Sequence, residues 1–121
     1  MAHNKTFGDY LRELRIIRDV SLRKLAKELK MDVGNLSKIE TGRLKPPMKE
    51  DFIDDAADIL KLKKEEKQHL IDIASHENGE YPRDIKKNLK EHSYIPVLLR
   101  TISNKKLSEE KIRELTKKLN S

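Results

Sequence analysis

The chain has 121 residues, of which 40% are charged, 36% hydrophobic and 4% aromatic, and it contains no cysteine and no tryptophan. This length suits one compact domain, or a small domain with an appendage, built on a thin aliphatic core. Disulfide scaffolds, cysteine-based zinc sites and cysteine nucleophiles are excluded, and a deep enclosed enzyme pocket is not expected at this size.

No apolar run reaches the roughly 18 residues of a membrane-spanning helix. The first residues also lack the apolar stretch of a signal peptide. We therefore expect a soluble cytoplasmic protein with no membrane contact.

The net charge of +6 is unevenly distributed. Residues 1–49 hold 12 Lys/Arg against 6 Asp/Glu, residues 50–80 hold 4 against 10, and residues 81–121 hold 11 against 5. Basic ends of this kind favour an anionic partner such as nucleic acid. The alternative is that these charges only solvate helix surfaces.

The first predicted helix covers residues 7–18. Its apolar residues recur at steps of three and four, which is typical of an amphipathic helix; they are Phe7, Tyr10, Leu11, Leu14 and Ile17. Thr6 is the predicted N-cap.

Two more helices are predicted over residues 22–29 and 33–40, capped by Ser21 and Asp32. The interruption between them is short, at residues 30–32. Gly42 suits a left-handed helix end, and the Pro46-Pro47 pair predicts an extended loop.

Further helices are predicted over residues 49–60 and 64–76, followed by an Asn78-Gly79 turn. We place a domain boundary there, giving a domain at residues 1–78 and a helical region at residues 79–121. That region is predicted to form two or three short helices, the last of them capped by Ser108.

Residues 21–42 form the segment most indicative of function, because they read as helix, tight turn and helix. The second helix places apolar residues on one side and polar ones on the other. A short polar-faced helix fits the major groove of B-DNA, which is about 12 Å wide. The alternative is a pair of helices packed in a bundle with no ligand.

Residues 7–60 resemble the Cro and lambda-repressor type of helix-turn-helix domain, the XRE family. The resemblance rests on the motifs at Phe7–Arg15, Ser21–Ala26 and Leu36–Gly42 and on the prolines that follow. It implies an all-α fold: a five-helix lambda-repressor-like DNA-binding domain, here with a short α-helical C-terminal extension. It also implies that the third helix reads base edges in double-stranded DNA.

The resemblance assigns roles to individual residues. The base-facing set is Val33, Gly34, Asn35, Ser37 and Lys38; the phosphate-binding set is Ser21, Arg23, Thr41, Arg43 and Lys45. Lys38 can donate to guanine, Asn35 can pair with adenine or bind a phosphate, and Val33 can touch a thymine methyl group. A buried ion pair between Arg15 and Glu40 is implied, and it would orient the third helix.

Two positions depart from the family pattern. Lys30 stands where the turn often has glycine, and a non-glycine residue in the left-handed conformation costs roughly 1–2 kcal/mol. We therefore expect the turn to differ slightly. Gly34 removes a side chain from a frequent readout position, which shifts specificity toward DNA shape.

The remaining polar clusters carry no catalytic pattern. His69 and His76 are interpreted as exposed residues rather than metal ligands, and no cofactor is expected. The acidic residues of the 49–60 helix are interpreted as a solvated face. We expect a protein that is not an enzyme.

The C-terminal region has more apolar residues than an isolated short helix can bury. They are Ile95, Val97, Leu98, Leu99, Ile102, Ile112, Leu115 and Leu119. Three interpretations stay open: packing against the first domain, a homodimer interface, or binding of a different protein.

The hypothesis from sequence is a sequence-specific transcriptional regulator, a repressor that binds a palindromic operator as a homodimer. One alternative is an antitoxin-like or switch protein whose C-terminal helices bind a partner protein. Another is a protein-interaction module whose helix-turn-helix no longer binds DNA.

Overall fold

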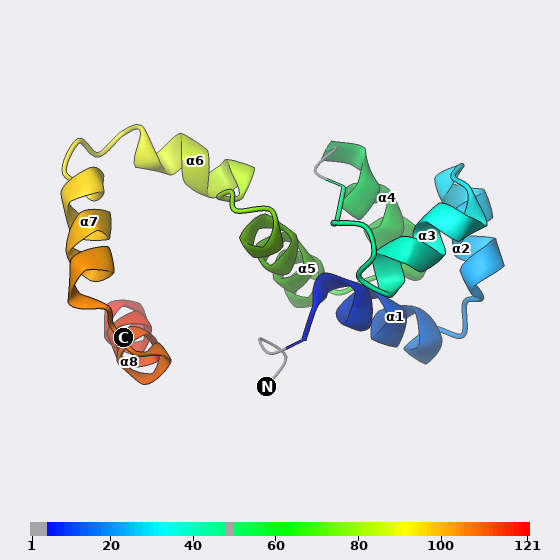
Figure 1. Cartoon of the computed structure of the whole chain (residues 1–121), viewed down its shortest axis with the longest axis horizontal. Helices are drawn as coiled ribbons and strands as arrows, with labels where there is room; N and C mark the ends of the chain where they lie inside the picture. Colours follow the sequence, from blue (N-terminus) through cyan, green and yellow to red (C-terminus); the bar gives the residue numbers. More distant parts are fainter. Residues whose placement is uncertain (1–4, 48–49) are drawn as a thin grey trace. The chain divides into compact units, whose positions relative to one another are not determined.

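The computed structural model describes residues 5–47 and 50–121, and within them the chain forms eight helices and no strand. This confirms the predicted all-α fold. The chain divides into two compact units, one ending at Pro82 and the other covering Arg83–Ser121 (Figure 1). The division lies slightly beyond the boundary proposed from sequence, after residue 78.

The first unit holds five helices. They are α1 (Phe7–Ile17), α2 (Leu22–Leu29), α3 (Val33–Glu40), α4 (Glu50–Leu60) and α5 (Lys64–Glu77). Helix α3 contacts both α1 and α2, while α5 contacts α1 and α4 (Figure 1). Residue 49, the predicted start of α4, lies outside the described residues.

Side-chain caps begin the first three helices at the predicted residues. Thr6, Ser21 and Asp32 each accept a hydrogen bond from the backbone amide three residues further along, at 3.0–3.1 Å. Each cap satisfies an amide that has no partner inside its own helix. The sequence therefore fixes where these helices begin.

One aliphatic core joins these helices. Its buried members are Phe7, Leu11, Leu14, Leu25, Ala26, Leu36, Ile39, Leu60, Leu70, Ile73 and Ala74. Every described helix of the first unit contributes to it, so that burying this apolar surface is what holds the short helices in place.

The predicted apolar face of α1 was wrong at its last member. Ile17 is 66% exposed, because the core contact of α1 ends at Leu14. Beyond the helix the chain turns through Asp19, which has a positive φ of 56°, and Val20 packs against the core instead.

Lys30 adopts the left-handed conformation that the turn between α2 and α3 requires, with φ 58° and ψ 43°. Two hydrogen bonds close the helix end, from Lys30 N to Lys27 O at 3.1 Å and from Met31 N to Ala26 O at 3.0 Å. This pair of hydrogen bonds is usual where an α-helix ends at a residue in the left-handed conformation. Lys30 itself therefore takes the left-handed position, at the steric cost expected for a non-glycine residue, and a slight departure of this turn from the family pattern stays a prediction.

The second unit consists of α6 (Arg83–Leu89), α7 (Ile95–Lys105) and α8 (Glu109–Asn120). Ser108 caps α8 by accepting from Lys111 N at 3.2 Å. Helices α7 and α8 have no buried residue. Among all described residues, no helix combines the length and apolar character needed to cross a membrane.

Candidate nucleic-acid interface

Helix α3 buries one side and exposes the other. Leu36 and Ile39 lie in the core, whereas Gly34, Asn35 and Lys38 are exposed. The long polar side chains of Asn35 and Lys38 are therefore free to approach a ligand from solvent.

The other two base-facing candidates are less accessible. Ser37 is half-buried, and Val33 is half-buried with its side chain packed against the core. Part of the Val33 surface is therefore already used in folding. The structure brings all five candidates onto one short helix but leaves Asn35 and Lys38 as the two most able to reach outward.

An ion pair connects α1 to the last residue of α3. Arg15 donates from Nε to Glu40 Oε2 at 2.8 Å and from Nη2 to Glu40 Oε1 at 3.0 Å, in a bidentate arrangement. The two side chains are only 12% and 5% exposed. A third bond from Arg15 Nη1 to Val20 O, at 3.0 Å, holds the guanidinium in one orientation.

A glycine allows α1 to lie directly against the same end of α3. A Cβ atom placed on Gly8 would lie 2.5 Å from Ile39 O and 2.7 Å from the carbonyl carbon of Glu40. No real side chain is accommodated at such distances. Residue 8 must therefore be glycine for α1 and α3 to keep this spacing.

The five phosphate-binding candidates are all exposed. Two of them also have internal roles, since Ser21 caps α2 and the Thr41 hydroxyl donates to Lys38 O at 3.3 Å. Arg23, Arg43 and Lys45 have no such role among the described residues. These three cations can supply charge to an anionic partner.

One carbonyl group of α3 binds two residues of the loop that follows the helix. Lys38 O accepts from Arg43 N at 2.8 Å and from Leu44 N at 3.1 Å. This arrangement fixes the backbone of Arg43 relative to Lys38. Sequence reasoning missed it, although Gly42, with φ 82°, signals the chain reversal that makes it possible.

A second ion pair joins Arg18, the residue after α1, to Glu66 of α5. Arg18 donates to both carboxylate oxygens of Glu66, at 3.1 and 2.5 Å, and Glu66 also accepts from Lys63 N at 2.8 Å. The hydrogen bond from Arg18 lowers the pKa of Glu66 below its ordinary value. Burial, followed by the charge of Glu66, raises the pKa of Tyr10.

His69 is not the exposed residue that the sequence suggested. It is half-buried, its ring meets that of Tyr10 edge to face at 4.9 Å, and its Nε2 is buried without a hydrogen-bond partner in the described structure. His76 is exposed as expected. The described residues contain no group of three His, Asp or Glu side chains placed to hold a metal ion.

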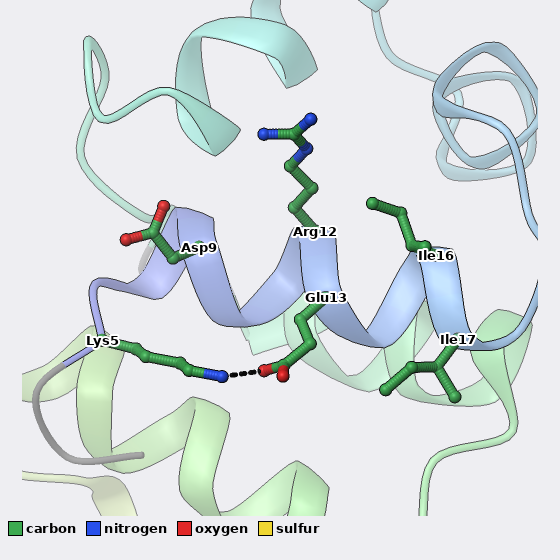
Figure 2. A pocket seen from close by; sticks show the side chains of 6 residues that line it. All are labelled: Lys5, Asp9, Arg12, Glu13, Ile16 and Ile17. Carbon is green, nitrogen blue, oxygen red and sulfur yellow. Dashed lines mark hydrogen bonds and ion pairs between the residues drawn. The ribbon is translucent and has the colours of Figure 1, made fainter. Parts of the chain in front are cut away.

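An open hollow runs along the outer side of α1 (Figure 2). It is lined by Lys5, Asp9, Arg12, Glu13, Ile16 and Ile17. Lys5 and Glu13 form an ion pair at one side, while Arg12 points to the other. No residue of α3 lines it, so it is separate from the candidate base-facing surface.

The geometry of the first unit agrees with a comparison against known families. Residues 6–70, more than half of the chain, match the model of the helix-turn-helix domain. A search of curated proteins and a search of solved structures each give no match. The chain belongs to the helix-turn-helix domain family.

Proposed function

We propose that the protein is a sequence-specific regulator of transcription that inserts α3 into the major groove of double-stranded DNA. The observation that carries this proposal is the exposure of Asn35 and Lys38 on a short helix whose opposite side is buried. Lys38 would donate to guanine O6 and N7, and Asn35 would pair with adenine.

Phosphate contacts would come from the surroundings of α3. Arg43 and Lys45 follow the helix, while Ser21 and Arg23 begin α2, and all four are exposed. Such contacts set the register on the duplex and carry no sequence information. Arg15 and Glu40 would act indirectly, by fixing the orientation of α3.

Few side chains are available for direct readout. Gly34 offers none, and Val33 is partly committed to the core. We infer that DNA shape and deformability supply part of the specificity.

We further propose that the protein acts as a homodimer through its second unit. Apolar side chains there are exposed: Val97, Leu98, Ile112, Leu115 and Leu119. Removing such surface from water is favourable by roughly 25 cal/mol per Å², before the entropy cost of association is subtracted. Exposed apolar side chains in this number are typical of a surface that a partner covers.

The charges of α8 favour a second copy as that partner. Its first turn contains Glu109 and Glu110, and its last turn contains Lys117 and Lys118. Two antiparallel α8 helices would place opposite charges beside each other, and a twofold axis perpendicular to the helices relates such a pair. A dimer of this symmetry suits a palindromic operator, with its two α3 helices about 34 Å apart.

The choice of repression over activation follows from the family resemblance alone. A protein bound across a promoter excludes RNA polymerase, and we therefore propose a repressor.

Selection of bound duplexes from a random library tests the proposal, combined with measurement of the protein's mass in solution. The expected result is a set of palindromic sites and a mass of twice 14.2 kDa. Leu115→Glu should yield monomers, whereas Thr116→Glu, at an exposed neighbouring position, should not. Enrichment of no sequence would contradict specific DNA binding, and a tight complex with a different polypeptide would indicate the antitoxin-like alternative.

A further inference from the structure

Two residues at the C-terminal end of α5 form hydrogen bonds with segments that adjoin α3, namely the loop after α3 and the start of α1. Asn78 ends this helix, and its Nδ2 donates to Pro46 O at 2.9 Å and to Ala74 O at 3.0 Å. The neighbouring Glu77 accepts from Phe7 N at 2.7 Å.

The bond to Pro46 fixes the loop that follows α3. Arg43 and Lys45 lie in this loop, whose near end is already held by the carbonyl of Lys38. Pro46 and Pro47 have no backbone N–H, so neither can donate a backbone hydrogen bond to hold the far end. The side-chain amide of Asn78 supplies the missing donor, and Pro46 itself is buried.

The bond to Phe7 fixes the start of α1. Phe7 precedes Gly8, which lies against the carbonyl groups at the end of α3. The amide of Phe7 is in the first turn of α1, where it has no partner within the helix. Glu77 therefore satisfies an otherwise unpaired donor and holds α1 where it supports α3.

We propose that Asn78 is a positioning residue for DNA binding, acting through Arg43 and Lys45 on the phosphate backbone. This inference rests on the proposed function. In this role Asn78 would act without contacting DNA, by fixing the course of the loop from which both exposed cations extend. Its loss should therefore weaken binding to every duplex and leave base preference unchanged.

The test is a titration of full-length protein with a selected duplex and a random duplex of equal length, at several salt concentrations. For Asn78→Ala we expect binding to both duplexes to weaken about fivefold, and the slope of log affinity against log salt to fall by about 1. Gln68→Ala is the matched control, because it removes a side-chain amide hydrogen bond, to Asp72, on the exposed side of the same helix. It should bind like the wild type.

A double variant separates positioning from general weakening. If Asn78 acts through Arg43, then Asn78→Ala should weaken binding less in the Arg43→Ala variant than in the wild type. Full additivity of the two effects would overturn the proposal, as would wild-type affinity and slope in Asn78→Ala. Failure of the wild type to bind any duplex would instead refute the proposed function itself.

A fold check accompanies each titration. If Asn78→Ala melts near the assay temperature, Asn78→Asp takes its place, since it keeps the shape of the side chain but has no N–H donor. Its charge control is Gln68→Glu. Weaker binding with a salt slope reduced by about 1 in Asn78→Asp, and not in Gln68→Glu, supports the proposal, and equal behaviour of the two variants refutes it.

Discussion

Gly8 of α1 lies so close to Glu40 of α3 that a methyl group at Gly8 would overlap the backbone of Glu40. The two helices touch at the residue where α3 ends and where Arg15 holds the Glu40 carboxylate. The position of α3 thus depends on a glycine and an ion pair at the same end of the helix, and neither faces the proposed DNA surface.

Gly8→Ala should be strongly destabilising. Overpacking at a rigid backbone contact costs about 1–3 kcal/mol, and the carbonyl groups of α3 cannot move without displacing the helix. Gly34→Ala is the control: its Cβ would meet only Asp32 Oδ2, the end of a flexible side chain. Because Asp32 Oδ2 also caps α3 by accepting from Asn35 N, Gly34→Ala can lose that cap, which is worth about 1 kcal/mol, but it displaces no backbone. In urea unfolding, Gly8→Ala should therefore be the less stable variant, and equal effects of the two substitutions would refute this packing account.

Arg15→Ala should lower the free energy of unfolding by about 3 kcal/mol, because it leaves the buried Glu40 carboxylate without its partner. Lys67→Ala breaks the more exposed pair with Asp54, which spans 2.9 Å, and should cost no more than about 1 kcal/mol. Chemical denaturation of the two variants gives the comparison. A similar decrease in the free energy of unfolding for both variants would show that burial does not determine how much the Arg15–Glu40 pair stabilises the fold.

Lys30→Gly should stabilise the protein by about 1 kcal/mol, since glycine adopts the left-handed conformation without steric cost. Lys27→Gly, inside α2, should be destabilising by about 1 kcal/mol, because glycine is a poor helix former. Thermal unfolding should therefore shift in opposite directions for the two substitutions. A lower melting temperature for Lys30→Gly would mean that Lys30 makes an interaction that outweighs its strain.

Lowering the pH should remove the contribution of Glu66 to the free energy of unfolding. Its pKa is lowered in the folded state by the hydrogen bond from Arg18. The stabilisation is therefore present above the ordinary pKa of 4.5 and is lost as the pH falls through the folded value. Glu66→Gln should be less stable than the wild type at pH 7, and this difference should shrink toward pH 3; a difference that stays constant over this range would contradict the account.

Local chemistry explains which parts of the fold the sequence predicts. Thr6, Ser21 and Asp32 predict helix starts correctly, because the side chain of each accepts a hydrogen bond from an amide in the first turn of its own helix. The Asn78–Pro46 and Glu77–Phe7 hydrogen bonds were not predicted, since each joins residues far apart in the sequence. Only the packed arrangement of α1, α3 and α5 brings these partners together.

The exposed state of Ile17 and the partial burial of Val33 escaped prediction for a related reason. Spacing assigns a residue to a helix face, but it does not tell how far the neighbouring helix extends along that face. The partner of the second unit was likewise left open by the sequence, because an apolar stripe does not specify what covers it.

The central claim is that the exposed side of α3 reads base edges. The most direct measurement compares Lys38→Ala with Arg43→Ala on a selected duplex and on duplexes with single base-pair changes. We predict that Lys38→Ala loses discrimination at one base pair, by about 1–3 kcal/mol, while Arg43→Ala weakens all duplexes alike and reduces the salt slope by about 1. If Lys38→Ala keeps the full base preference of the wild type, α3 does not read DNA in the way proposed.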